Sequence, residues 1–237
     1  EPSSTPGPPC SAASRSRSAT EQRRVAVADL EPPWLTWSRE LLAIAQTGLA
    51  FSQDPYDRRR YEALRELAGR VVGAQAETDP RQGVELFAGE RGYATPKLEV
   101  RAAVFDDDGR ILMVREVLDG GRWTLPGGWA DVNLSPAQNV EKETLEESGY
   151  RVRAHKLVAA WDKRRQGHPP GLFAITKLFF LCELLGGEPT PSLETSEIGW
   201  FAQHALPADL SVGRVLRTQL ERMFEHRRDP GLPTDFD

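Results

Sequence analysis

Three glutamates within residues 135–149 have a spacing that suits the binding of a divalent cation. Glu143 and Glu147 are four residues apart with Glu146 between them, so all three share one face if the segment is helical. Like charges at this spacing repel and destabilise a bare helix by roughly 0.2–0.5 kcal/mol per pair. Mg²⁺ would remove this repulsion, because it binds carboxylate oxygens and still accepts water and phosphate oxygens. A solvated acidic face is the alternative, and the glutamates alone favour it.

The residues around these glutamates predict a well-defined helix that follows a tight loop. Ser135 can cap the helix, Pro136 suits its first turn, and Gln138 completes a capping box. Gly149 can end the helix in a left-handed conformation. A Pro-Gly-Gly sequence at 126–128 precedes the helix. A solvated acidic face needs neither this loop nor these caps, so the flanks favour a functional site.

Residues 125–150, LPGGWADVNLSPAQNVEKETLEESGY, resemble the Nudix box, whose pattern is Gly, five residues, Glu, seven residues, Arg-Glu-aliphatic-any-Glu-Glu-any-Gly-aliphatic. The positions that match in register are Gly128, Glu143, Glu146, Glu147, Gly149 and Tyr150. Leu134 stands in place of the first Glu, Lys142 in place of Arg, and Thr144 in place of the aliphatic residue. Lys142 keeps the charge without the planar fork of arginine. The glutamate cluster is intact, so we expect an active site.

The resemblance implies that water attacks one phosphorus of a diphosphate, with Mg²⁺ or Mn²⁺ neutralising charge and positioning the substrate. Glu143 and Glu147 would be the main metal ligands, and Glu146 would be a third ligand or a neighbour that supports one. In related enzymes the base comes from the box helix or from a later loop. Glu194 and Glu197 are the candidates of the second kind, although an ordinary surface role fits each of them equally well.

Four further residues could contact a substrate. Gly127 and Gly128 would let the backbone approach closely. Trp129 could stack on a base or ribose. Arg101, on a predicted strand, could reach a phosphate. Three of them also have a structural interpretation: a tight turn for Gly127, a structural plug for Trp129, and a surface ion pair for Arg101.

The loop 162–170, DKRRQGHPP, collects positive charge that could steer an anionic substrate. Its members are Lys163, Arg164, Arg165 and His168. A solvated loop is the preferred interpretation for all of them except Lys163, which we expect to bind substrate. His168 is not expected to bind a metal, because no second histidine lies nearby in the sequence.

Two helices are predicted before the box, separated by a turn at Asp54 and Pro55. The apolar face of the first comprises Trp34, Trp37, Leu41, Ile44 and Leu49. That of the second comprises Tyr61, Leu64, Ala68, Val71 and Val72. Two helices alone make a poor core, so they should pack on the rest of the chain or on a partner copy.

This region and the sequence GGWADV followed by Leu-Ser-Pro resemble one Nudix branch, which acts on nucleoside diphosphates linked to a moiety X. Members of that branch are similar to ADP-ribose and CDP-choline pyrophosphatases. The resemblance implies a homodimer, and it makes Leu134 a trait of the branch.

The apolar period changes after residue 97, and strands and helices then alternate without repeats. The expected elements are two strands around a tight turn (98–105 and 110–117), strands near 152–162 and 174–185, and a helix near 212–226. Trp200 and Phe201 are assigned to the core. The fold class is α+β, and the resemblance implies a Nudix α/β/α sandwich with a mixed sheet after a small helical domain. The expected divisions are a disordered tail (1–30), a helical hairpin (31–78), a linker (79–96), the Nudix domain (97–228) and a tail (229–237).

Composition limits the function classes. A net charge of −5 gives no global positive field for nucleic acid or a membrane surface. No run reaches the roughly 20 apolar residues of a membrane helix. Cys10 and Cys182 make neither a disulfide framework nor a zinc site, so we expect a reducing, cytoplasmic setting.

The leading hypothesis is a pyrophosphohydrolase of ADP-ribose or CDP-choline type substrates. One alternative is an RNA 3′-exonuclease or decapping activity that uses the basic residues of segment 1–30. The other is a nucleotide-sensing regulator built on an inactive Nudix domain.

Overall fold

A computed structural model describes residues 31–75 and 89–237 of the chain. The expected tail 1–30, with Cys10, and residues 76–88, which hold most of the expected linker, lie outside the described residues. Within the described ranges, no helix is long and apolar enough to cross a membrane.

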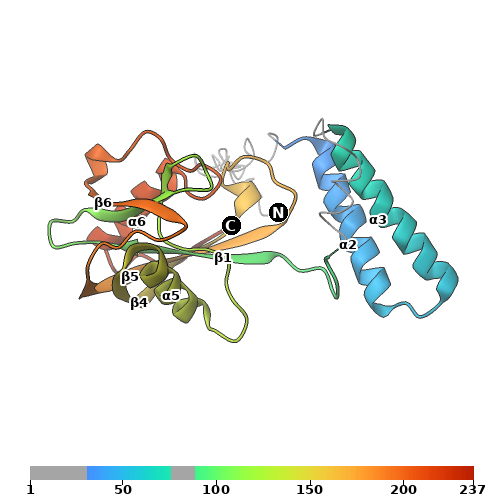
Figure 1. Ribbon diagram of the computed structural model, residues 1–237, viewed down its shortest axis with the longest axis horizontal. Helices are drawn as coiled ribbons and strands as arrows, with labels where there is room; N and C mark the ends of the chain where they lie inside the picture. The colour runs from blue at the N-terminus through green and yellow to red at the C-terminus, as the bar shows by residue number, and fades with distance from the viewer. Residues whose placement is uncertain (1–30, 76–88) are drawn as a thin grey trace, which may run out of the picture.

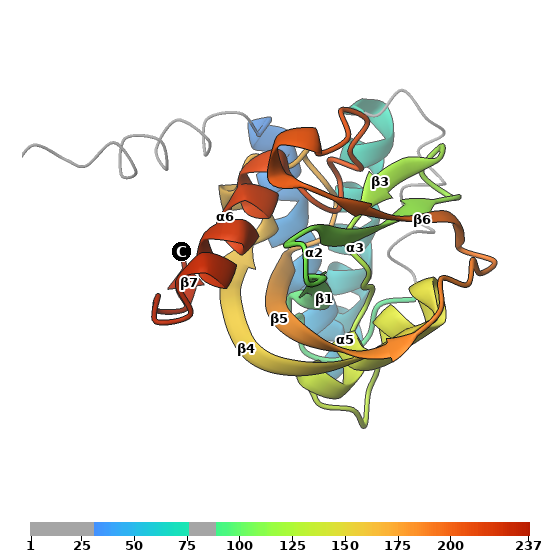
Figure 2. The same ribbon diagram turned by 90° about the vertical axis from the view of Figure 1, so that its left-hand side faces the viewer.

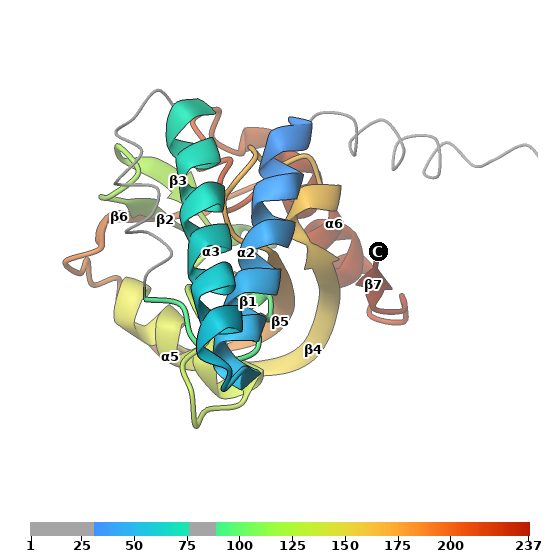
Figure 3. The same cartoon turned by 90° about the vertical axis from the view of Figure 1, so that its right-hand side faces the viewer.

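The first two helices form a hairpin at one end of the molecule (Figures 1 and 3). They are α2 (Pro33–Phe51) and α3 (Pro55–Gln75), and Asp54 begins α3 by accepting hydrogen bonds from the next turn. Their shared core comprises Leu42, Ala68 and Val72. The predicted apolar face of α2 was only partly correct, because Trp37 is 61% exposed and Ile44 is 55% exposed. The helix buries the neighbouring stripe of Leu35, Ser38, Leu42 and Ala45 instead.

The rest of the chain builds two sheets. One has the order β1-β5-β4-β7 and the other the order β3-β2-β6. The strands of the first are β1 (Lys97–Val104), β5 (Ile175–Gly187), β4 (Tyr150–Asp162) and β7 (Asp235–Phe236). Those of the second are β3 (Arg122–Thr124), β2 (Ile111–Glu116) and β6 (Thr195–Phe201). β1 pairs with β5 in parallel whereas β4 pairs with β5 antiparallel, so the first sheet is mixed, as predicted.

The two strands expected around a tight turn are β1 and β2, and they do not form a regular hairpin. The turn at 106–110 is present, with the backbone N–H of Gly109 donating to the carbonyl of Asp106. A single bridge between Phe105 and Ile111 links the strands, which then enter different sheets. The alternation of apolar residues predicts a strand but not its partner.

Helices α5 (Pro136–Ser148) and α6 (Arg217–Arg228) pack on opposite faces of the sheets (Figure 2). Val140 of α5 belongs to the same core cluster as Ala102 of β1, whereas Met223 of α6 shares a cluster with Ala103. Neighbouring residues of a strand point to opposite faces, so β1 contributes to both clusters. The α/β/α sandwich is therefore confirmed, and the predicted core residues Trp200 and Phe201 are partly buried against these clusters.

The caps predicted for α5 are confirmed. Ser135 and Gln138 form the capping box, and Gly149 ends the helix at φ 76°. Residues 229–237, which were expected as a C-terminal tail, contact the domain. β7 pairs with β4, and Lys156 donates hydrogen bonds to the carbonyls of Pro230 and Leu232.

Candidate active site

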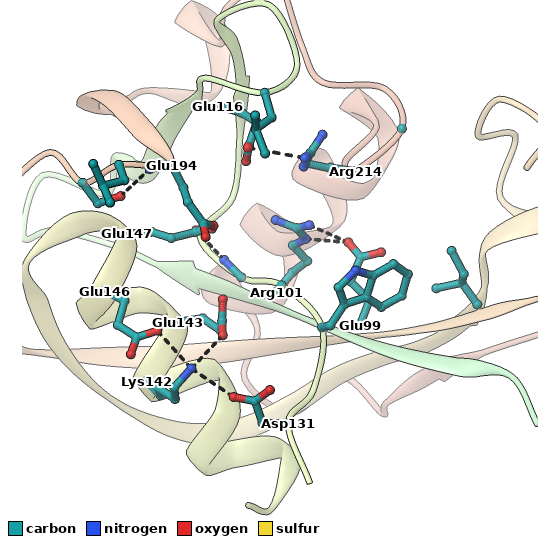
Figure 4. A pocket seen from close by; sticks show the side chains of 18 of the residues that line it. Glu99, Arg101, Glu116, Asp131, Lys142, Glu143, Glu146, Glu147, Glu194 and Arg214 are labelled. Atoms are coloured by element: carbon teal, nitrogen blue, oxygen red, sulfur yellow. Dashed lines mark hydrogen bonds and ion pairs between the residues drawn. The ribbon is translucent and has the colours of Figure 1, made fainter. Parts of the chain in front are cut away.

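A cavity of about 790 Å³ opens between α5, the glycine loop, and loops that follow β2 and β5. Figure 4 shows acidic side chains of α5 on one side of it, Glu99 and Arg101 of β1 beside them, and Arg214 opposite. Nine of the ten predicted site residues line this cavity. They are Glu143, Glu146, Glu147, Glu194, Gly127, Gly128, Trp129, Arg101 and Lys163.

The prediction that places Glu197 in the site is not supported by its position. Its carboxylate pairs with Nη1 of Arg115 at 2.6 Å, and its side chain is 55% exposed outside the cavity. The two residues are cross-strand partners on β6 and β2, so the sheet register explains the contact. Glu194 lies in the preceding loop, at the cavity edge, where its charge acts on Glu143.

The loop that faces α5 requires glycine at position 127, and at position 128 a side chain would displace the carboxylate of Glu143. Gly127 has φ +139°, and a Cβ there would lie 2.1 Å from the carbonyl oxygen of Val100. At Gly128, a Cβ would lie 2.6 Å from Oε2 of Glu143. The backbone N–H of Gly127 donates to Oε2 of Glu147 at 2.8 Å. The glycines thus allow the loop to lie directly on β1 and on two glutamates of the helix.

Glu147 is buried, and its pKa is raised to about 7. Burial is the main cause, and the charges of Glu143 and Glu116 add to it, whereas Arg101 and the Gly127 hydrogen bond oppose it. Burial also raises the pKa of Glu143. A positive ion placed among these carboxylates would favour their charged forms.

The negative charge of these carboxylates therefore suits a divalent cation, but their side chains are not yet arranged to bind one. Across residues 31–75 and 89–237, no three Asp, Glu, His or Cys side chains converge closely enough to hold one ion. Instead, Nζ of Lys142 lies 3.1 Å from Asp131, 3.3 Å from Glu143 and 3.0 Å from Glu146 (Figure 4). Its hydrogen bond with Glu146, followed by that with Asp131, raises the pKa of Lys142 well above its usual range. Metal binding by Glu146 would require this carboxylate to leave Lys142.

A buried ion cluster forms the floor of the cavity beside the acidic helix. Glu99 accepts hydrogen bonds from Nε of Arg101 at 2.7 Å and from Nζ of Lys177 at 2.6 Å. Burial opposes the charged carboxylate, but the two cations prevail and lower the pKa of Glu99 to about 2. Nη1 of Arg101 donates to the carbonyl of Leu125 at 2.9 Å. Arg101 thus lines the cavity as predicted, although much of its hydrogen-bonding capacity is already used by the protein.

Two further cations face the cavity from loops. Burial lowers the pKa of Lys163, and repulsion from Arg101 and Arg214 adds to this effect. Arg214 lies 3.4 Å from Glu116 and 3.7 Å from Asp119. Repulsion among these cations makes this side of the cavity suitable for an anion.

Glu99, Glu116 and Arg214 also line the cavity and were not predicted from the sequence. Glu99 and Glu116 are acidic residues within mainly apolar strands, LEVRAAVF for Glu99 and ILMVRE for Glu116, and both are buried. Because unpaired charges are rarely buried, each could have been marked as a residue with a nearby partner. Arg214 carried no such signal.

The fold and this site define a class. The NUDIX domain model matches residues 95–219, and a model described as a UDP-X-like, N-terminal oligomerisation domain matches residues 32–87. The chain therefore belongs to the Nudix hydrolase family, whose members act on pyrophosphate bonds.

Individual relatives agree with this assignment. The chain is 41% identical over 208 residues to the Bacillus subtilis (strain 168) protein named "Putative ADP-ribose pyrophosphatase YjhB", covering 88% of this chain and 99% of the relative. A crystal structure of an ADP-ribose pyrophosphatase from Streptococcus suis 89-1591 is 44% identical with a TM-score of 0.55, covering 60% of this chain and 100% of that one. A crystal structure of a UDP-X diphosphatase is 32% identical with a TM-score of 0.55, covering 86% and 98%.

Proposed function

We propose that the protein hydrolyses the diphosphate of a nucleoside diphosphate linked to a moiety X, giving a nucleoside monophosphate and phospho-X. The observation that carries this proposal is the division of charge in one cavity. Glu147 and Glu143 are carboxylates whose pKa burial raises, and Lys163 and Arg214 are cations that face them. In a metal–diphosphate complex, the positive metal is complementary to the carboxylates and the negative phosphates are complementary to the cations.

Glu143 and Glu147 would hold Mg²⁺ or Mn²⁺, with Glu146 joining them after it leaves Lys142. The metal would supply a Lewis acid for the phosphate oxygens and would lower the pKa of a bound water. Lys163 and Arg214 would bind the remaining phosphate oxygens. Glu194 is the candidate base for the attacking water, because it lines the cavity and its charge acts on Glu143.

The mouth of the cavity supports a nucleoside at one end of the substrate. Leu193 is 98% exposed and Leu118 is 82% exposed, and both line the cavity together with the half-exposed Trp129. Exposed apolar side chains beside a charged floor suit a planar base next to a diphosphate. ADP-ribose and CDP-choline are the proposed substrate types, and UDP conjugates belong in the same test because of the structural relative named above.

The biological unit is proposed to be a homodimer formed through the helical hairpin, in a cytoplasmic setting. The matching model is described as an oligomerisation domain, and the hairpin exposes large apolar side chains. These are Trp37, Ile44, Phe51, Tyr56 and Leu67. The free thiol of Cys182 is buried in β5, which fits a reducing compartment.

Neither alternative gains a specific observation. The hypothesis of an RNA-processing activity relied on the basic residues of segment 1–30, which lies outside the described residues. A sensor on an inactive domain predicted the loss of the glutamate cluster, and this cluster lines the cavity.

The test is product analysis with ADP-ribose, CDP-choline and a UDP-sugar, each with Mg²⁺ or with a chelator. We expect one nucleoside monophosphate per conjugate cut, no product with the chelator, and a rate at least about 100-fold lower for Glu147→Gln. The matched control is Glu183→Gln, which changes an exposed glutamate paired with Arg153 on the surface. If the wild-type protein leaves all conjugates intact, or if Glu147→Gln remains fully active, the proposal is wrong.

A further inference from the structure

Residues 163–173 run from the cavity to the helical hairpin, and we call them the bridging segment. Its first residue, Lys163, lines the cavity. Two carboxylates fix this end: Asp162 caps the 3-10 helix that Lys163 begins, and Asp237 accepts hydrogen bonds from the backbone N–H of Asp162 and from Nε2 of Gln166. The backbone that carries Lys163 is therefore held in place from outside the cavity.

His168 links the middle of the bridging segment to a second cavity loop. Its side chain is buried, and Nδ1 lies 2.7 Å from the carbonyl oxygen of Val212. Burial, aided by the charge of Lys177, lowers the pKa of His168 to about 4, so the ring is neutral at pH 7. Because a carbonyl only accepts, the single ring proton lies on Nδ1. Val212 is followed directly by Gly213 and Arg214, both of which line the cavity.

The far end of the bridging segment is attached to the helical hairpin. The guanidinium of Arg39, on α2, donates to the carbonyl of Gly171 and pairs with Glu31. Leu172 and Phe173 pack against the hairpin core of Leu42, Ala68 and Val72. One continuous stretch therefore joins the hairpin to both loops that bring cations to the cavity.

We propose that His168 is a positioning residue, and that its hydrogen bond to Val212 holds Lys163 and Arg214 at the spacing that binds the substrate's phosphates. The bridging segment fixes this pair relative to the helical hairpin, so the hairpin contributes to substrate binding without contacting the substrate. The inference rests on the proposed function, because it assigns the two cations to the diphosphate.

The physical reason is that the two cations repel each other. Lys163 and Arg214 line the same cavity, and after burial and Arg101 the charge of Arg214 also contributes to the lowered pKa of Lys163. Without a link between them, the two segments that carry these like charges would tend to move apart, and an incoming anion would then have to bring them together. A hydrogen bond between the loops removes this cost before binding, which is the usual benefit of preorganisation.

The first test compares His168→Leu, which loses the ring donor, with His168→Asn, whose amide nitrogen can replace Nδ1. KM and kcat are measured for the conjugate that the wild-type protein cuts, and ADP binding is measured by calorimetry. We expect His168→Leu to raise KM and the Kd for ADP by roughly threefold to tenfold, with kcat within about twofold. His168→Asn should recover most of both losses. The control is His204→Leu, at an exposed histidine.

Unchanged KM and ADP affinity in His168→Leu would overturn the inference, as would a failure of His168→Asn to recover them. If the wild-type protein cuts no conjugate, the proposed function fails on that result, and calorimetry with ADP still decides the positioning role. The link to the hairpin is tested by Arg39→Met against Arg60→Met, since the Arg60 side chain is 75% exposed. Weaker ADP binding in Arg39→Met alone supports the link, and equal binding in both variants contradicts it.

Discussion

Replacing Glu99 by Gln should destabilise the protein strongly, because it removes the carboxylate that pairs with two buried cations. Arg101 and Lys177 are 3% and 0% exposed, and both contact Oε1 of Glu99 within 2.7 Å. Removing one partner of a buried ion pair costs about 3–5 kcal/mol. Burial and the charge of Arg101 hold the pKa of Lys177 at about 7, against the attraction of Glu99. Lys177 can therefore lose its proton in the variant, and we expect the lower end, about 3 kcal/mol.

The assay is urea unfolding at pH 7 of Glu99→Gln, Lys177→Met and the double variant, with Glu183→Gln as control. The two cluster residues are in direct contact, so the double variant should be more stable than the sum of the single effects predicts, by about 1–3 kcal/mol. The control breaks only an exposed pair and should cost less than about 1 kcal/mol. A loss below about 1 kcal/mol in Glu99→Gln, or simple additivity, would refute the assignment of this cluster as a coupled structural unit.

The same cluster gives a dependence on pH. In the unfolded chain Glu99 titrates near its ordinary value of 4.5, whereas in the folded protein its pKa is about 2. As pH falls, the unfolded state takes up this proton first. The stabilisation is thus complete above pH 4.5 and is lost between pH 4.5 and 2, so wild type and Glu99→Gln should converge in stability over that range.

The glycine loop, His168 and the helical hairpin each allow a further test. Gly127→Ala places a methyl 2.1 Å from a strand carbonyl at φ +139°, so it should cost at least about 3 kcal/mol in thermal unfolding. Gly171→Ala, which meets nothing within 4 Å, should leave the melting temperature nearly unchanged. The pKa of His168 is about 4 in the folded protein and near its ordinary value of 6.5 in the unfolded chain, so the unfolded state takes up this proton first as pH falls. The free energy of unfolding of the wild-type protein should therefore decrease by about 3 kcal/mol between pH 6.5 and 4, and His168→Asn should lack this dependence on pH. Trp37→Ser with Ile44→Ser should convert a dimer to a monomer in sedimentation, and a wild-type protein that sediments as a monomer would contradict the proposed assembly.

Local signals in the sequence were sufficient to predict the helix that carries the glutamates. The capping box joins Ser135 to Gln138, and Gly149 ends the helix by a hydrogen bond to Leu145. The interacting residues are three or four positions apart, so a short stretch of sequence contains both partners of each contact. The Pro-Gly-Gly loop could also be predicted from neighbouring residues. Its contacts with the rest of the protein could not. The carbonyl that excludes a side chain at Gly127 belongs to Val100, which lies on β1 and is distant in the sequence.

Long-range pairing could not be predicted from the sequence. Glu99 meets Lys177 because β1 and β5 pair in parallel with these two residues in register. Nothing near either residue specifies that register. Likewise, Glu194 and Glu197 are three residues apart in the sequence, and both were candidates for the cavity. Glu197 pairs with Arg115 across β6 and β2, and this contact keeps Glu197 out of the cavity. The exposed face of α2 has the same explanation, since packing decides which stripe of an amphipathic helix is covered.

Glu99 and Glu147 show how the surroundings of a carboxylate decide its use in this cavity. Both are buried to a similar degree, 5% and 4% exposed, yet the pKa of Glu99 is about 2 and that of Glu147 about 7. Burial raises both values. Glu99 is compensated by two cations in direct contact, whereas Glu147 has one backbone N–H and is repelled by Glu143 and Glu116. A further cation would therefore gain little at Glu99 and much at Glu147. Opposite shifts in two neighbouring acidic groups commonly mark different roles, and here they support the proposal that a metal would bind the carboxylates of α5, with Glu99 on β1 in a structural role.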